Sequence, residues 1–150
     1  MSRIRLLALL AACLMVLAFA TSAMAAGGGS PGDDNLNGSG RADTMQLRGG
    51  DDVAKGGAGD DRMFGGAGDD RLNGGVGDDR MNGGAGDDVL TDDRGTDRFS
   101  GGAGDDRIDA RDRRGRDDAR DVVDCGAGRD TVYADRVDAV SRNCERVLRR

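Results

Sequence analysis

The nine residues Gly-Gly-Ala-Gly-Asp-Asp-Arg-Met-Phe at positions 56–64 recur along the chain with small changes. Close copies occupy residues 65–73, 74–82, 83–91 and 101–109. Residues 92–100 keep the length of this unit but few of its letters, and three weaker copies precede residue 56 in the same register. Nine consecutive nonapeptides, called frames below, therefore fill residues 29–109. A fixed period of this kind indicates a repeat architecture.

Two further frames, 116–124 and 125–133, follow a six-residue insert at residues 110–115. Position six of every frame is aspartate: Asp34, Asp43, Asp52, Asp61, Asp70, Asp79, Asp88, Asp97, Asp106, Asp121 and Asp130. Position eight is always apolar. Because side chains alternate between the two faces of a strand, we expect position eight to point inward and positions seven and nine to face outward.

These frames resemble the repeat G-G-x-G-x-D-x-U-x (U apolar) of the RTX family of secreted calcium-binding proteins. The resemblance implies that the first six residues of a frame form a turn and the last three a short strand. It also implies an all-β fold in which two frames complete one coil of a right-handed parallel β-roll, or β-helix solenoid. Calcium ions are then expected between turns stacked on the same side.

A coil of two frames sorts the apolar residues at position eight into two columns. One column is Leu36, Ala54, Leu72, Leu90 and Ile108, and the other is Met45, Met63, Met81 and Phe99. The nonapeptide period alone does not require one leucine-rich and one methionine-rich column. Their separation therefore supports two frames per coil, with a thin core between the two columns.

Calcium binds six to eight oxygens at about 2.3–2.6 Å, from carboxylates and backbone carbonyls. The position-six aspartates are the predicted carboxylate ligands. Glycines allow positive φ and let the turn direct its carbonyls to one point, so the first glycines of the best frames join the predicted site. These are Gly56, Gly65, Gly74, Gly83 and Gly101.

The strongest calcium sites are expected between turns that both keep the full motif. These pairs are Asp61 with Asp79, Asp70 with Asp88, and Asp88 with Asp106. Weaker sites are expected at the frames that begin with Gly38, Leu47 and Asp92. The acidic residues at position five are expected to be solvated turn surface.

The composition excludes several classes of protein. Among 150 residues there are 27 glycines, one proline, no histidine and no tryptophan. Glycine does not recur every third residue, which excludes collagen, and histidine-dependent catalytic or zinc sites are impossible. Since the apolar core is thin, we expect the calcium-free chain to be largely disordered and to fold on binding calcium. A disordered acidic chain that only buffers ions is the competing hypothesis.

Residues 1–25 have the features of a signal peptide: two arginines, an apolar run over residues 6–20 and Ala23-Met24-Ala25 as a cleavage site. Leu10-Ala11-Ala12-Cys13 also resembles a lipobox, so a lipoprotein anchored at Cys13 is the alternative to a secreted chain. Removal of the segment changes the net charge from −6 to −8. Nucleic acid is therefore not an expected partner, and no membrane insertion is expected after cleavage. Residues 26–28 are expected to be a short linker.

Cys125 and Cys144 are the two cysteines outside the signal segment. In an exported chain they predict a disulfide, although one could remain free or join two chains. Residues 134–150 lose the repeat and are expected to cap the roll, because an open coil exposes core and strand edges. No nucleophile motif is present, so we expect a calcium-binding protein and no enzyme.

Many relatives of this family carry a toxin or enzyme domain, but this sequence has none, so those activities are not expected of it. The alternative function is a calcium-dependent adhesion or cell-envelope component. In that case, outward rows of arginine at position seven (Arg62, Arg80 and Arg98; Arg71 and Arg107) would contact an envelope polymer. Simple pairing of these arginines with neighbouring aspartates is the other interpretation.

Overall fold

The structure is a computed structural model that describes residues 26–112 and 119–150. The expected signal peptide and lipobox, and half of the expected insert (residues 113–115), lie outside the described residues. The described chain forms fourteen strands in two parallel sheets of seven strands each. No helix in the described ranges is long and apolar enough to span a membrane.

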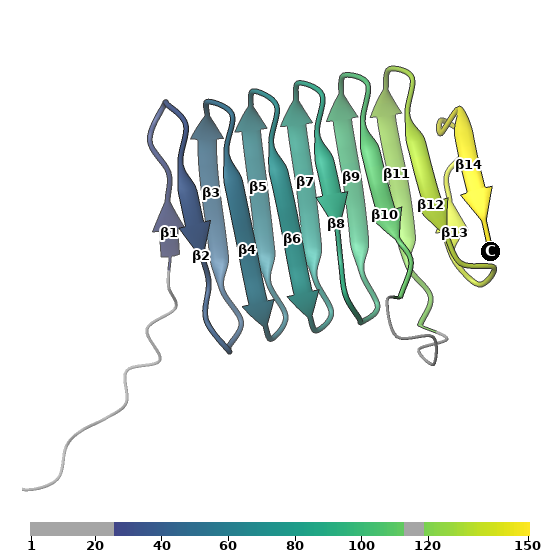
Figure 1. Cartoon of the computed structure of the whole chain (residues 1–150), viewed down its shortest axis with the longest axis horizontal. Helices are drawn as coiled ribbons and strands as arrows, with labels where there is room; N and C mark the ends of the chain where they lie inside the picture. The colour runs from purple at the N-terminus through teal and green to yellow at the C-terminus, as the bar shows by residue number, and fades with distance from the viewer. Residues whose placement is uncertain (1–25, 113–118) are drawn as a thin grey trace, which may run out of the picture.

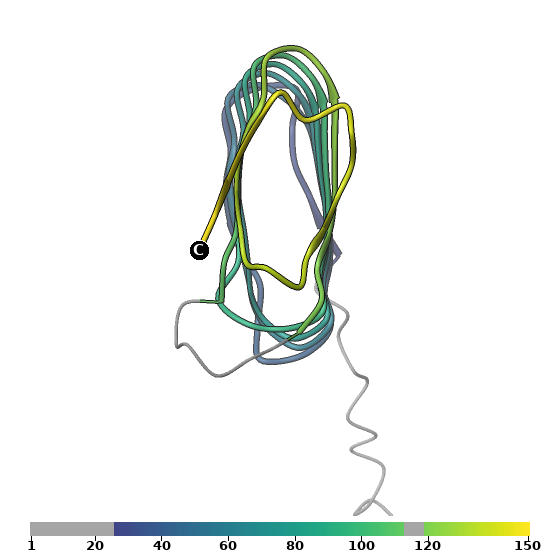
Figure 2. The same cartoon turned by 90° about the vertical axis from the view of Figure 1, so that its right-hand side faces the viewer.

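The chain alternates between the two sheets at every strand, so each pair of strands makes one coil. Sheet A contains β1 (Ala26–Gly28), β3 (Thr44–Gly49), β5 (Arg62–Ala67), β7 (Arg80–Ala85), β9 (Arg98–Ala103), β11 (Val122–Ala127) and β13 (Ala139–Val140). Sheet B contains β2 (Asn35–Asn37), β4 (Val53–Ala58), β6 (Arg71–Val76), β8 (Val89–Thr91), β10 (Arg107–Ala110), β12 (Thr131–Ala134) and β14 (Arg146–Arg149). Seen along its axis, the chain is a flattened tube with one sheet as each wall (Figures 1 and 2). The predicted β-roll is confirmed.

Seven of the fourteen strands have six residues, twice the three expected from the repeat. In β5 the strand covers positions seven to nine of one frame and positions one to three of the next. Gly66 pairs with Gly84, and Ala67 with Ala85, in the neighbouring coil. The turn between strands is therefore confined to positions four to six. The expectation of a six-residue turn was therefore wrong. Glycine has no side chain that would indicate a strand in the sequence, but the backbone at positions one to three continues the parallel pairing.

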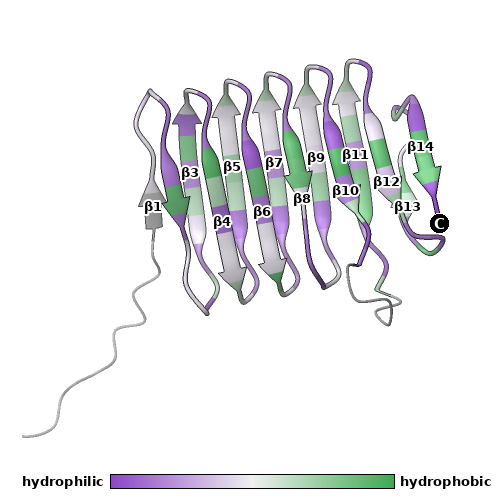
Figure 3. Cartoon of the chain, viewed as in Figure 1, coloured by the Kyte–Doolittle hydropathy of each residue, from purple (hydrophilic) through white to green (hydrophobic). Residues whose placement is uncertain are grey.

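The two predicted apolar columns are confirmed by the pairing of neighbouring strands. Met45 pairs with Met63, Met63 with Met81, and Met81 with Phe99 in sheet A. In sheet B the pairs run from Leu36 through Ala54, Leu72 and Leu90 to Ile108. All these residues except Leu36 are at most 2% exposed. Figure 3 shows the corresponding apolar band across the middle of the sheet B strands.

The ends of the roll differ from the expected boundaries. Residues 26–28, expected to be a linker, form β1 and pair with β3. The first residue of the expected insert, Ala110, is the last residue of β10 and pairs with Ala134. The tail also continues both sheets, because β13 pairs with β11 and β14 with β12. The expected cap is thus built largely as a further, shortened coil.

Candidate metal-binding turns

The position-six aspartates form two rows, one along each edge of the roll where the chain crosses between sheets. One row is Asp34, Asp52, Asp70, Asp88, Asp106 and Asp130, and the other is Asp43, Asp61, Asp79, Asp97 and Asp121. All of them except Asp34 are buried. The turn after each six-residue strand has only positions four to six, and every turn connects two strands that lie in opposite walls of the tube. The carboxylates are consequently placed inside the turns and away from solvent.

After the first aspartate of each row, every carboxylate accepts a hydrogen bond on Oδ1 from the backbone of the preceding coil. The N–H of Asp70 donates to Asp88 Oδ1 at 2.9 Å, and the N–H of Asp88 donates to Asp106 Oδ1 at 2.9 Å. The N–H of Asp61 donates to Asp79 Oδ1 at 2.7 Å. The three turn pairs predicted as the strongest sites are therefore stacked next to each other. Equivalent bonds connect the remaining members of both rows.

The second carboxylate oxygen has no hydrogen-bond partner in most of these turns. This applies to the buried Oδ2 atoms of Asp52, Asp61, Asp70, Asp79, Asp88, Asp106 and Asp130. Buried polar atoms are nearly always hydrogen-bonded, and an unpaired buried charge is costly. A whole series of such atoms at equivalent positions therefore fits the binding of cations.

The predicted glycines lie beside these oxygens. A methyl group on Gly65 would overlap Asp70 Oδ2 and would lie 2.5 Å from the carbonyl oxygen of Gly83, one coil further along. The surroundings of Gly56, Gly83 and Gly101 are the same in kind. Each of these turns thus brings an anionic oxygen and a neutral carbonyl oxygen together in a space that only glycine leaves open. This donor set fits a hard, oxygen-binding cation such as calcium.

The pKa values show how poorly the cation-free turns tolerate charge. Burial raises the pKa of Asp88 to about 7, with a further contribution from Asp106 and Asp70. Burial raises the pKa of Asp106 to about 6 and that of Asp121 to about 8, again with neighbouring carboxylates adding to the shift. A bound cation would favour the charged form of all three groups.

The two N-terminal frames differ from the rest. The N–H of Ser39 donates to Asp43 Oδ2 at 2.6 Å, and the Ser39 hydroxyl donates to the same atom at 2.9 Å. The N–H of Ser30 donates to Asp34 Oδ2 in the same way. Here serine occupies position two and already supplies the hydrogen bonds that the other turns lack. The prediction of a weaker site at the Gly38 frame has this physical basis and stays a prediction.

The position-five carboxylates are exposed, as expected for turn surface, but they also form ladders of their own. The N–H of Asp69 donates to Asp51 Oδ1 at 2.9 Å, and the N–H of Asp87 donates to Asp69 Oδ1 at 2.8 Å. The ladder continues through Asp105 to Arg129, whose side chain forms an ion pair with Asp105 at 2.7 Å. These side chains point toward the C-terminal coils, whereas those at position six point toward the N-terminal coils.

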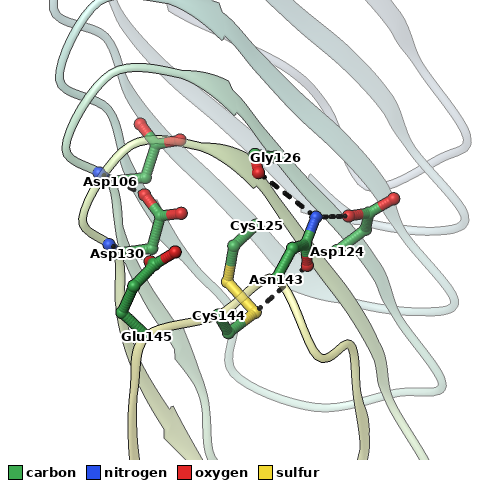
Figure 4. The surroundings of a disulfide bond; sticks show 8 residues. All are labelled: Asp106, Asp124, Cys125, Gly126, Asp130, Asn143, Cys144 and Glu145. Carbon is green, nitrogen blue, oxygen red and sulfur yellow. Dashed lines mark hydrogen bonds between the residues drawn. A yellow bond between two sulfur atoms is a disulfide. The ribbon is translucent and has the colours of Figure 1, made fainter.

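Two carboxylates of the tail were missed by the sequence prediction. The N–H of Asp130 donates to Glu145 Oε2 at 2.8 Å, and the N–H of Asp121 donates to Asp138 Oδ1 at 3.2 Å. Glu145 and Asp138 thus take the place of position-six aspartates for the last coil, and Figure 4 shows Glu145 next to Asp130 and Asp106. The signal was a carboxylate followed two residues later by valine, at Asp138-Ala139-Val140 and Glu145-Arg146-Val147.

The tail is also held covalently. Cys125, at position one of its frame, forms the predicted disulfide with Cys144, with a Cα–Cα distance of 5.2 Å (Figure 4). Asn143 donates from Nδ2 to Asp124 Oδ1 at 2.7 Å, next to the disulfide. The disulfide and this hydrogen bond fix the tail over the final coil, where it presents Glu145 to the row of aspartates.

Comparison with known proteins agrees with this arrangement. A family model described as RTX calcium-binding nonapeptide repeat matches the chain four times, over residues 28–61, 48–81, 55–90 and 82–112. No curated protein and no solved structure matches the chain. The four matches together span residues 28–112, which is more than half of the sequence. With its stacked Gly-Asp turns and its two parallel sheets, the chain belongs to the family of RTX calcium-binding nonapeptide repeat proteins.

Proposed function

We propose that this protein is exported and that calcium bound between stacked turns holds its coils together, so that calcium binding and folding are one coupled process. The observation that carries the proposal is the series of buried Oδ2 atoms without a partner. In the absence of a cation these carboxylates are desolvated and lie close to one another. Calcium would compensate both costs at once, and its role is structural instead of catalytic.

The core supports the same conclusion. Each coil buries only about two apolar side chains at position eight, one per sheet. This burial opposes the conformational entropy of a glycine-rich chain, which is large because glycine loses more freedom on folding than any other residue. Metal binding that occurs only in the folded state adds its free energy directly to folding.

Export is supported by the N-terminal sequence and by the disulfide, which persists in oxidising compartments. Calcium is abundant outside cells, where binding modules have dissociation constants on the order of 10⁻⁴–10⁻³ M. We propose that cleavage follows Ala25 and releases a soluble chain, with anchoring at Cys13 as the alternative. Mass spectrometry of the chain recovered from the medium tests this, because a start at Ala26 supports secretion and a lipid-modified Cys13 contradicts it.

The calcium proposal is tested by flow dialysis of the mature chain with ⁴⁵Ca. We expect several ions per chain, bound cooperatively in the range of about 0.1–1 mM. Magnesium is the matched control ion, because it requires a smaller octahedral site and retains its water. The absence of saturable calcium binding, or equal binding of magnesium, would overturn the proposal.

A second candidate function is favoured by the outer face of sheet A. Arg62, Arg80 and Arg98 are exposed and lie side by side in neighbouring strands, with the exposed Phe64 beside them. Three like charges at strand spacing repel one another and favour an anionic partner. We propose that an acidic polymer of the cell envelope contacts this row when calcium has folded the roll.

Sedimentation with purified cell walls distinguishes this role from a purely structural one. The wild-type chain should be retained in calcium and released by a chelator, and replacement of the three arginines with glutamine should abolish retention. The matched control is the double change Arg71→Gln and Arg107→Gln on the other sheet. Retention that is independent of calcium, or equal in both variants, argues against the polymer contact.

A further inference from the structure

The degenerate frame 92–100 carries aspartate at position one, where most frames carry glycine. Position one faces inward, and Asp92 is only 4% exposed. It follows β8 directly and lies at the edge of the roll where the chain crosses from sheet B to β9. A carboxylate is thereby placed between two stacked turns whose position-six aspartates are Asp79 and Asp97.

The Asp92 carboxylate occupies the place that a backbone carbonyl has in the other turns. Next to Gly65, Gly83 and Gly101, the neighbouring oxygens are the carboxylate of the same frame and the position-one carbonyl of the next coil. Next to Gly74, the neighbouring oxygens are Asp79 Oδ2 and the side-chain oxygen Asp92 Oδ1. At this turn a charged carboxylate oxygen therefore replaces the neutral carbonyl oxygen of the other turns. The N–H of Gly75 donates to Asp92 Oδ1 at 2.8 Å and fixes its position.

Three carboxylates converge at this turn. One oxygen from each of Asp79, Asp92 and Asp97 lies within 4.8 Å of the others. Two oxygens that each lie about 2.4 Å from the same calcium ion can be at most about 4.8 Å apart, so these three groups meet the distance condition for sharing one ion. All three residues are buried.

The turn contains buried oxygens that nothing in the described structure satisfies. Asp79 Oδ2 and Asp92 Oδ2 have no hydrogen-bond partner. Both side chains are fixed through their other oxygen, Asp79 by the N–H of Asp61 and Asp92 by the N–H of Gly75. Burial raises the pKa of Asp79 to about 7 and that of Asp92 to about 9, and the neighbouring carboxylates contribute to both shifts. The charged forms of these carboxyl groups are therefore strongly disfavoured unless a cation lies beside them.

We propose that Asp79, Asp92 and Asp97 form a three-carboxylate calcium site that binds its ion more tightly than the two-carboxylate turns and releases it last. This inference rests on the proposed calcium-dependent function. It reverses the expectation that the frame beginning with Asp92 holds a weak site, because the replacement of the position-one glycine by Asp92 adds a carboxylate ligand. Calcium affinity in proteins is tuned by the number of charged ligands and by the rigidity of the site, and both favour this turn.

Release kinetics test the proposal on the mature chain. The calcium-loaded protein is mixed rapidly with an excess of a fluorescent chelator, which counts the ions as they leave. We expect one ion per chain to leave at least about tenfold more slowly than the others. Asp92→Asn, which removes only the charge, and Asp92→Gly, which restores the residue of the other frames, should both abolish this slow phase.

The matched control is Asp93→Asn, which makes the same charge change one residue away at a less buried position. It should retain the slow phase. Far-UV circular dichroism in saturating calcium confirms that each variant forms the roll, and Asp92→Gly keeps the test valid if Asp92→Asn does not fold. Release of all wild-type ions at one rate, or an unchanged slow phase in both Asp92 variants, would overturn the inference. A wild-type chain that binds no calcium would instead overturn the proposed function itself.

Discussion

Position two of the repeat has a positive φ in the well-formed frames, as at Gly66 with φ 122°. In the frame 47–55 the same position is Arg48, with φ 82°. It is the one non-glycine residue with positive φ in the described part of the chain. An L-residue in the left-handed region costs about 1–2 kcal/mol, and the exposed Arg48 side chain offers little packing to offset this cost.

We therefore expect Arg48→Gly to stabilise the calcium-loaded roll by about 1 kcal/mol, because glycine adopts this backbone conformation without strain. Chemical denaturation at saturating calcium measures the change in the free energy of unfolding. Arg62→Gly is the control, since it removes an exposed arginine from within β5 and should destabilise the protein. A loss of stability in Arg48→Gly would contradict this prediction, because it would mean that the Arg48 side chain stabilises the fold by more than the strain of its backbone costs.

Turns that carry two adjacent acids, such as Asp69 and Asp70, allow the effect of metal binding to be separated from that of surface charge. Asp70→Asn retains the Oδ1 acceptor for the Asp52 N–H but removes the charge from the buried oxygen beside Gly65. The calcium concentration at the midpoint of folding should rise by roughly 3- to 10-fold. Asp69→Asn makes the same change at an exposed position and should shift that midpoint by less than about twofold. Equal shifts in the two variants would contradict the assignment of position six as the ligand.

At the level of elements, the last coil depends on the tail. The strands β13 and β14 are short, and β14 forms an edge of sheet B. Their attachment comes from Glu145 and Asp138, which continue the rows of carboxylates, and from the disulfide between Cys125 and Cys144. The bridge closes a segment with a sequence separation of 19 residues.

Reduction of this disulfide should lower the free energy of unfolding by about 3 kcal/mol, since the reduced, unfolded chain regains the entropy of an open loop of that size. Denaturant titration at saturating calcium, with and without reductant, measures the difference. The double variant Cys125→Ala and Cys144→Ala should match the reduced protein and should be insensitive to reductant. An unchanged midpoint on reduction would contradict a stabilising role for the cap.

The rows of turns also predict an unusual response to pH. Asp88, Asp106 and Asp121 have pKa values of about 7, 6 and 8 in the cation-free fold, above the ordinary value of 3.8. The folded state therefore binds protons more tightly than the unfolded chain. Protonation stabilises the cation-free roll, and this stabilisation is lost as pH rises from about 4 through 6–8.

In a chelator, strand content should accordingly increase as the pH is lowered from 8 to about 4.5. In saturating calcium, acidification over the same range should weaken the fold, because protons compete with the ion for the carboxylates. Far-UV circular dichroism across pH in both conditions measures the two trends. The same direction of change in both conditions would contradict the link between these turns and the cation.

The sequence predicted those parts of the fold that follow from the repeat itself. The inward position eight and the 18-residue coil leave one way to stack Met45 on Met63 and Leu72 on Leu90. Positions one to three were missed because Gly65 and Gly66 have no side chains whose alternation could indicate a strand. The tail carboxylates Asp138 and Glu145 were not predicted as part of the rows, because they follow Asp121 and Asp130 by 17 and 15 residues and not by the 18-residue period. From the sequence alone, Asp92 is interpreted as a weakening of the motif. Its proximity to Asp79 arises only when the turns stack in the folded structure.

At the scale of the whole molecule, the roll is a tube with a thin apolar core and two edges of concentrated negative charge. The pairing within the sheets, the disulfide and the hydrogen bonds between position-five aspartates do not themselves involve a cation. The position-six rows oppose folding unless a cation compensates them. We therefore propose that calcium, and not apolar burial, decides whether the chain is folded at neutral pH.

The most direct test is far-UV circular dichroism of the mature chain with its disulfide intact, first after exhaustive chelation at neutral pH and then during a calcium titration. If calcium holds the coils together, we expect little strand signal in the chelator and a cooperative increase that is complete at millimolar calcium. Thermal unfolding should become cooperative over the same range. An identical spectrum and an identical melting temperature in chelator and in calcium would contradict this role of calcium.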